Sequence, residues 1–197
     1  MHALPHADVF APDPYLAMDD GAAASPEYLD RCRRVRVGPA VTLVFENRQT
    51  LWFRVQELAR VARLTAPSLV KRELDWYARL LPGDECVRAA VWVAEPGRRP
   101  TKAIEMVRRA VAQGRIGLRC ADGREVIGVP RDDRINDRLI GLTNWVEFQF
   151  EEAELAALAD PQLEWRVVVE AVGYVHESEP LTETVRESLL ADLNRDG

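Results

Sequence analysis

The sequence predicts an α+β domain, with four to five helices packed on a mainly antiparallel sheet. Segments that alternate apolar and polar side chains are joined by short turns, and single helical segments separate them without a regular β–α–β order. A doubly wound parallel sheet is the alternative. The 197 residues are 47% hydrophobic and 29% charged, close to the averages of a soluble globular protein. Length and composition therefore indicate a single domain.

Residues 1–27 differ from the rest of the chain and are predicted to form an N-terminal arm. The arm has four prolines and an alanine run but no sustained period of a helix or strand. Residues 1–30 hold six acids and neither Lys nor Arg. We expect this acidic arm to be poorly ordered and place the single α+β domain at residues 28–197.

The first half of the domain has the pattern of a hairpin followed by helices. Apolar residues alternate on both sides of the turn signal Gly38-Pro39. Pro67 is typical of a helix start, and Pro82 of the residues that follow a helix end. The expected strands are 35–37, 41–45, 50–53 and 86–95, and the expected helices are 55–64, 65–81 and 101–113.

The second half contains the strongest turn signal, because Asp122-Gly123 is typical of a hairpin turn. A long Val-rich strand is expected to bend at Gly173. Thr184 and Glu187 have the spacing of a capping box at the start of the last helix. The expected strands are 116–120, 125–129, 146–150 and 163–176, the helices are 151–159 and 184–193, and 131–138 is a loop.

The net charge of -6 conceals blocks of opposite sign. Residues 31–72 carry ten bases and two acids, which gives +8, whereas residues 151–197 carry three bases and twelve acids, which gives -9. Four arginines at the start of the basic block could contact nucleic-acid phosphates. Because the acidic arm adjoins them, we instead expect pairing with an acidic segment or protein partner and no nucleic acid. These arginines are Arg31, Arg33, Arg34 and Arg36.

Several classes of function lack their motifs. Neither of the two lysines follows the glycines of a phosphate-binding loop, so no nucleotide cofactor is expected. The four serines lie outside G-x-S-x-G, and H-E-x-x-H is absent. No apolar run approaches the roughly 18 residues of a membrane span. The three cysteines are far apart, as is typical of a reducing compartment, and we expect a cytoplasmic protein without membrane association.

An unusually polar cluster follows the second predicted strand. Glu46 and Glu57 are the only two acids among the ten bases of the basic block, so they are expected to stay ionised and form ion pairs. Glu57 and Arg60 lie three apart on a helix and can pair. A binding surface, a structural network and a solvated helix face all fit this composition. The cluster consists of Glu46, Asn47, Arg48, Thr50, Gln56, Glu57 and Arg60.

The same carboxylates suggest a divalent metal site as an alternative. Oxygen ligands suit hard cations, and a histidine suits borderline ones. His2 and His6 lie in the arm, which leaves His176 as the one histidine in the expected domain. The candidate ligands are Glu46, Glu57, Glu73, Glu95 and His176, although their spacing follows no metal-site period.

Several motifs together resemble a known family. The most specific block lies within residues 34–60 and reads R-V-R-V-G-P, F-E-N-R-x-T and Q-E-x-x-R. Further matches are E-L-x-x-Y-x-x-L-x-P from Glu73, Y-x-H ending at His176, and R-x-S-L-x-x-D-L from Arg186. These motifs resemble DUF3501, a bacterial family of unknown function. The resemblance covers about residues 31–193 without the arm, and Ala171 stands where the family has a second histidine.

The resemblance implies an accessory role, because members of this family are often encoded beside rubrerythrin-like and iron–sulfur oxidoreductase proteins. We therefore predict an accessory or binding protein in redox or metal stress rather than an enzyme. The polar cluster would be its pocket or partner surface, and its partner a rubrerythrin-like or iron–sulfur oxidoreductase. The alternative is a carboxylate-based metal-binding protein or metal-dependent enzyme.

Overall fold

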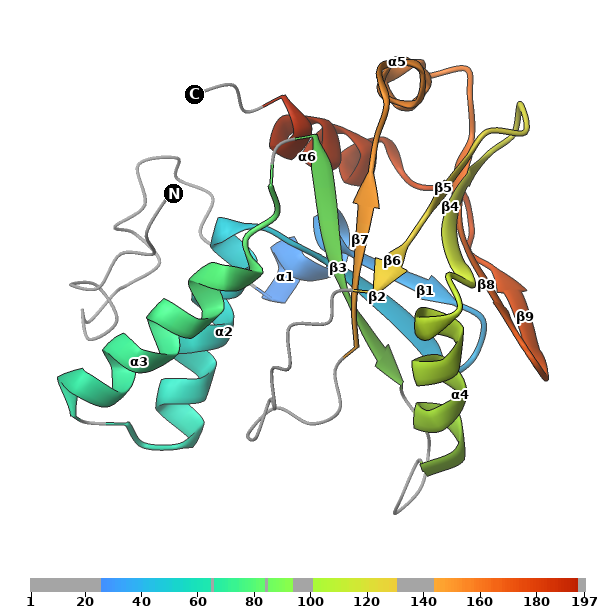
Figure 1. The fold of residues 1–197 in the computed structure, drawn as a ribbon. Helices are drawn as coiled ribbons and strands as arrows, with labels where there is room; N and C mark the ends of the chain where they lie inside the picture. The colour runs from blue at the N-terminus through green and yellow to red at the C-terminus, as the bar shows by residue number, and fades with distance from the viewer. Residues whose placement is uncertain (1–25, 65, 84, 94–100, 131–143, 195–197) are drawn as a thin grey trace.

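The computed structural model describes residues 26–64, 66–83, 85–93, 101–130 and 144–194. These residues form an α+β domain with two antiparallel sheets, which confirms the predicted fold class (Figure 1). The first sheet has the order β1-β2-β3-β7-β6, and the second has the order β5-β4-β8-β9. Among the described helices, none is long and apolar enough to cross a membrane.

The strands of the first sheet are β1 (Arg34–Val37), β2 (Val41–Glu46), β3 (Cys86–Val93), β7 (Asn144–Gln149) and β6 (Val129–Pro130). Those of the second sheet are β5 (Glu125–Ile127), β4 (Ile116–Cys120), β8 (Trp165–Ala171) and β9 (Tyr174–Glu177). The α-helices are α1 (Pro26–Tyr28), α2 (Arg48–Val61), α3 (Pro67–Tyr77), α4 (Thr101–Ala112), α5 (Glu152–Ala159) and α6 (Glu183–Leu193). A π-helical turn η2 (Leu29–Arg33) precedes β1, and a 3-10 turn η3 (Ala78–Leu80) follows α3.

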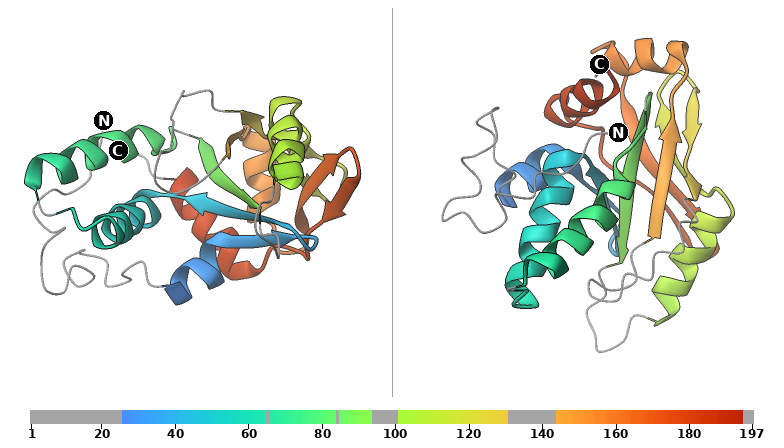
Figure 2. Two further views of the ribbon diagram at one scale, coloured as in Figure 1. Left: turned by 90° about the horizontal axis from the view of Figure 1, so that it is seen from below. Right: turned by 60° about the vertical axis from the view of Figure 1, so that its left-hand side comes forward.

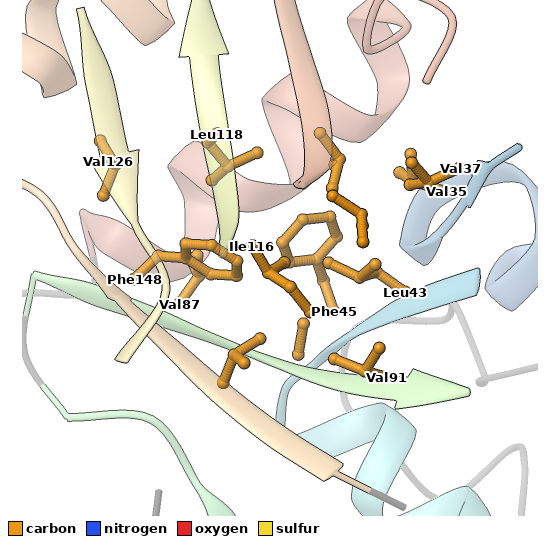
Figure 3. Close-up of a cluster of buried hydrophobic side chains, with 14 of the residues drawn as sticks. Val35, Val37, Leu43, Phe45, Val87, Val91, Ile116, Leu118, Val126 and Phe148 are labelled. Atoms are coloured by element: carbon orange, nitrogen blue, oxygen red, sulfur yellow. The ribbon is translucent and has the colours of Figure 1, made fainter. Parts of the chain in front are cut away.

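The main core lies between the two sheets (Figure 3). Alternate residues of β1, β2, β3 and β7 point inward, as the period of a strand requires, and meet the inner faces of β4 and β8. Phe45 and Phe148 are fully buried, with ring centroids 6.2 Å apart. Apolar side chains of α4, α5 and α6 complete this core.

A second core covers the outer face of the first sheet. Helices α2 and α3 lie on one side of β3 and β7, while α4 and β4 lie on the other (Figure 2). Trp52 of α2 and Tyr77 of α3 pack in one cluster with Ala90 and Trp145 of the sheet. Because this second core is centred on β3 and β7, it leaves the outer face of β1 and β2 for a different use.

The prediction of a strand at 50–53 before a helix at 55–64 is wrong, because one helix, α2, begins at Arg48. Asn47 has extended backbone and caps this helix. Its side chain accepts the Thr50 N–H at 3.0 Å, and the Thr50 hydroxyl accepts the Asn47 N–H at 2.8 Å. This reciprocal capping box satisfies two backbone donors at once and fixes the helix start.

The predicted single strand at 163–176 is two strands, β8 and β9, joined as a hairpin. Ala171 pairs with Tyr174, and Gly173 has a φ of 79°, which glycine adopts without steric cost. The last helix begins at Glu183 instead of 184, because Thr182 caps it by accepting the Val185 N–H. The predicted loop at 131–138 lies outside the described residues.

The Asp-Gly hairpin of β4 and β5 is confirmed, but its second strand is interrupted at Gly128. β5 pairs with β4, whereas β6 pairs with β7 in the other sheet. A Cβ atom on Gly128 would lie 2.9 Å from the carbonyl oxygen of Ile116, so only glycine fits this close approach. The chain therefore crosses from one sheet to the other at this residue.

Candidate ligand pocket

A cavity of about 610 Å³ opens on the outer face of β1 and β2. Its volume lies within the range of pockets that hold small molecules, about 300–1,000 Å³. Five elements and one turn contribute its lining: Leu29 of η2, Arg34 and Arg36 of β1, the turn residues Gly38 and Pro39, Val41, Thr42, Val44 and Glu46 of β2, Thr50, Phe53 and Arg54 of α2, and Trp92 of β3.

Strand register explains why polar side chains reach this face. Arg36 lies opposite Thr42, and Arg34 lies opposite Val44. Val35 and Val37, which alternate with the two arginines, are buried in the main core. Because successive side chains of a strand point to opposite faces, the arginines are directed to the outer face.

A buried ion pair forms one wall of the pocket. The Glu46 side chain is fully buried, and Arg54 is 12% exposed. Arg54 donates from Nε to Glu46 Oε1 at 2.8 Å and also from Nη2, and the Thr50 hydroxyl donates to Oε2. The Arg54 guanidinium also lies 4.9 Å from the ring centroid of Trp92 and 5.6 Å from that of Trp145. These contacts hold Arg54 between a carboxylate and two aromatic rings.

The other cations of the pocket differ in their partners. Arg34 forms an exposed ion pair with Asp30, four residues before it. Arg36 is exposed and forms no ion pair with any residue that the structure describes. The wall from β1 therefore presents one cation without a counter-ion in the described part of the chain.

The structure divides the predicted polar cluster. Glu46 and Thr50 line the pocket, whereas Asn47 caps α2 and donates to Asp192 Oδ1 at 3.4 Å. The predicted Glu57–Arg60 pair is confirmed, at 2.7 Å on the exposed side of α2, and the Arg60 guanidinium lowers the pKa of Glu57. This pair lies outside the pocket lining.

The two remaining members of the cluster, the half-buried Arg48 and the buried Gln56, also lie outside the pocket lining. The Nε atom of Arg48 and the Nε2 atom of Gln56 are buried and donate to no acceptor among the described residues. The cluster is therefore divided among pocket residues, a helix cap, a surface ion pair and two residues with buried donors that have no described acceptor.

The structure does not bring the four described candidates for metal ligation together. Glu46 binds Arg54, Glu57 binds Arg60, and Glu73 pairs with Arg72 at 3.2 Å. His176 lies on β9 with its ring centroid 4.3 Å from that of Tyr174. Across the described ranges, no three His, Cys, Asp or Glu side chains are grouped to hold a metal ion. Glu95, the fifth candidate, lies outside these ranges.

Two other motifs of the sequence support the fold beside the pocket. The Tyr174 hydroxyl accepts the N–H groups of Ala40 and Val41, both at 3.1 Å, and donates to the Val37 carbonyl. It therefore ties the β1–β2 turn, which includes Gly38 and Pro39, to β9. His176 touches the same turn, because a Cβ atom on Gly38 would lie 2.6 Å from its ring.

The C-terminal motif is structural. Arg33 and Asp192 form a buried ion pair between η2 and α6, with side chains 2% and 5% exposed. Arg186 donates to the carbonyl oxygens of Leu158 and Leu163 at 3.0 and 3.1 Å. These contacts join α5 and α6 and place η2 at the edge of the pocket.

Sequence reasoning missed Phe53, Arg54 and Trp92 as pocket residues. Arg54 was not recognisable as the partner of Glu46, because the prediction placed residues 50–53 in a strand. Arg36 carried a usable signal, since it alternates with valines that mark the buried face. Of the five tryptophans, Trp52, Trp145 and Trp165 are buried.

Comparisons with known proteins identify a family and a fold. Residues 5–193 match the model of the family described as "Protein of unknown function (DUF3501)", so the match includes most of the arm that the motif resemblance left out. A crystal structure of a novel protein of unknown function from Burkholderia pseudomallei K96243, at 1.90 Å resolution, is similar with a TM-score of 0.68 and 20% identity. The similarity covers 85% of this chain and 86% of that one, and it shows a shared fold. No curated protein matches.

Proposed function

Because the chain belongs to DUF3501, a family of unknown function, we propose a function from the pocket itself. The protein binds a small molecule in the pocket over β1 and β2. The observation that carries this proposal is the buried Glu46–Arg54 pair in the pocket wall. A charged pair removed from water costs desolvation energy, and its geometry must be well ordered to compensate. An ordered, charged wall beside a cavity of about 610 Å³ is a suitable arrangement for selective binding.

The elements around the pocket also support a preorganised site. α2 is fixed at its start by the Asn47–Thr50 capping box. The turn after β1 is fixed by three hydrogen bonds of the Tyr174 hydroxyl. Binding to such a site loses little conformational entropy, because its side chains and turns are already held before the ligand arrives.

A pocket-filling substitution tests the proposal. Val44 lies on the pocket floor and is 6% exposed, so Val44→Trp would occupy the cavity. Val175 on β9 is 71% exposed and outside the pocket, so Val175→Trp is the matched control. The assay is thermal unfolding against a library of organic acids, amines, sugars, nucleosides and neutral aromatic compounds. A ligand at a hundred times its Kd stabilises the native state by about 2.7 kcal/mol.

We expect at least one compound to raise the Tm of the wild type and of Val175→Trp but not that of Val44→Trp. If no compound stabilises the wild type more than Val44→Trp, the proposal is refuted. Far-UV circular dichroism of each variant checks that the fold is retained.

The oxidoreductase partner implied by the family resemblance is a separate proposal. The Arg60 side chain is 70% exposed on α2, where it pairs with Glu57. If a rubrerythrin-like or iron–sulfur oxidoreductase binds this side of α2, Arg60→Ala should weaken its capture while Val175→Trp should not. Equal capture by both variants would contradict a partner surface at Arg60.

A further inference from the structure

We propose that the pocket selects an organic acid with one negative charge and an apolar body, and that Arg36 binds its carboxylate. This inference rests on the proposed function and names the ligand class. It follows from the charge balance of the cavity, from the chemistry of its walls and from the position of Arg36 opposite Thr42 on β1.

The charge balance favours a single negative charge. Three arginines line the cavity, but Arg54 is paired with the buried Glu46 and Arg34 with Asp30. Arg36 remains without an ion-pair partner in the part of the chain that the structure describes. One unpaired cation is matched by one anionic group.

The immediate surroundings of Arg36 suit a carboxylate. A guanidinium offers two parallel N–H donors, which match the two oxygens of a carboxylate in a bidentate geometry. Thr42 lies directly opposite Arg36 in the strand register and adds a hydroxyl group on the same face. Such a charge-assisted contact is roughly twice as strong as a hydrogen bond between neutral groups.

The rest of the lining suits an apolar body. Leu29, Val44, Phe53 and Trp92 present aliphatic and aromatic surfaces to the cavity, and Pro39 adds another. These groups offer no charged partner, so they favour hydrocarbon over a second polar group. Removal of apolar surface from water favours binding. A ligand of this kind therefore gains affinity from its chain or ring, and orientation from its carboxylate.

Calorimetric titration with matched acids and amides tests the inference. The probes are octanoate and hydrocinnamate, each compared with its neutral amide, on the full chain. The variant is Arg36→Gln, and the control is Arg31→Gln, because Arg31 is an exposed arginine of the same segment outside the pocket lining. Both variants remove one positive charge, so the general field of the protein changes equally.

We expect an acid to bind the wild type about ten- to a hundredfold more tightly than its amide, as is usual for a hydrogen-bonded charge. Arg36→Gln should remove this preference, and Arg31→Gln should retain it. Any of four results would overturn the inference: equal binding of acid and amide, an unchanged preference in Arg36→Gln, tighter binding of inorganic phosphate than of the acids, or no binding of either acid. If the acids fail to bind but Val44→Trp prevents binding of another library compound, the proposed function is still supported. Failure of the ligand class is therefore distinguishable from failure of the proposed function.

Discussion

Replacing Glu46 by alanine tests whether the pocket wall depends on a buried, paired charge. The substitution removes the carboxylate and leaves the Arg54 guanidinium, 12% exposed, without its counter-ion. Breaking a buried pair on one side costs about 3–5 kcal/mol, because a charge is left desolvated and uncompensated. Such a loss is a large fraction of the roughly 5–15 kcal/mol by which a domain is stable.

Urea unfolding measures this loss directly. With a slope of about 2 kcal/mol per molar urea, Glu46→Ala should lower the midpoint by about 1.5–2.5 M. Glu57→Ala is the matched control, because it breaks a pair whose side chains are 38% and 70% exposed. An exposed pair contributes only about 0.2–1 kcal/mol. Glu57→Ala should therefore shift the midpoint by no more than about 0.5 M.

A double substitution separates the pair from the shape of the site. Arg54→Met keeps much of the volume of the arginine and removes its charge. Alone it leaves Glu46 buried and unpaired, whereas together with Glu46→Ala it removes both charges. Replacing both members of a buried pair by apolar groups is often neutral or stabilising. The double variant should be more stable than either single variant. If Glu46→Ala costs no more than Glu57→Ala, the reasoning about the pocket wall is refuted.

Three further predictions concern the turn, a buried thiol and metal content. Gly38→Ala should destabilise the protein by about 1 kcal/mol or more, because Gly38 has a φ of 63° and a Cβ atom there would collide with the His176 ring. The control is Gly83→Ala, which has open space around it and should have little effect on the urea midpoint. Burial, with the Glu147 carboxylate, raises the pKa of Cys86 from 9.0 to about 11, so alkylation of Cys86 at pH 8 should require unfolding. Because the pKa of Cys86 is raised in the folded state, the stability that this thiol contributes is present below pH 9 and is lost as the pH rises towards 11. Cys86→Ala should therefore weaken the alkaline decline in stability. An unchanged decline in the variant would contradict this prediction. Elemental analysis of protein purified without a histidine tag and supplemented with metal should give well below one equivalent, because Glu46, Glu57 and Glu73 each pair with an arginine. A stoichiometric metal would contradict this.

The features of the fold that local patterns determine were predictable. Alternation placed Val35, Leu43 and Phe45 on one buried face, and all three lie in the main core. The Asp-Gly turn correctly predicted the β4–β5 hairpin. Each of these predictions depends on neighbours in sequence, where strand period and turn chemistry act directly.

The start of α2 was mispredicted because two local tendencies compete there. Thr50, Trp52 and Phe53 are β-branched or aromatic, residue types that favour strands. The Asn47 side chain instead captures the Thr50 N–H, and this capping contact begins the helix. The spacing of Asn47 and Thr50 contained the signal, but only the packing of α2 against the second core determines which tendency prevails.

The pocket depended on this same helix start and could not be predicted without it. Glu46 ends β2, and Arg54 lies eight residues later, almost two turns into α2. A strand at 50–53 would separate their side chains, whereas a helix from Arg48 brings the guanidinium back over the sheet, against Trp92. Trp92 joins from a strand distant in sequence. The motif F-E-N-R-x-T is therefore explained physically: Asn47 and Thr50 turn the chain, so that Glu46 can hold Arg54 in the pocket wall. The motif specifies the geometry of the wall, while Arg36 on the neighbouring strand β1, which has no ion-pair partner among the described residues, remains available to a ligand.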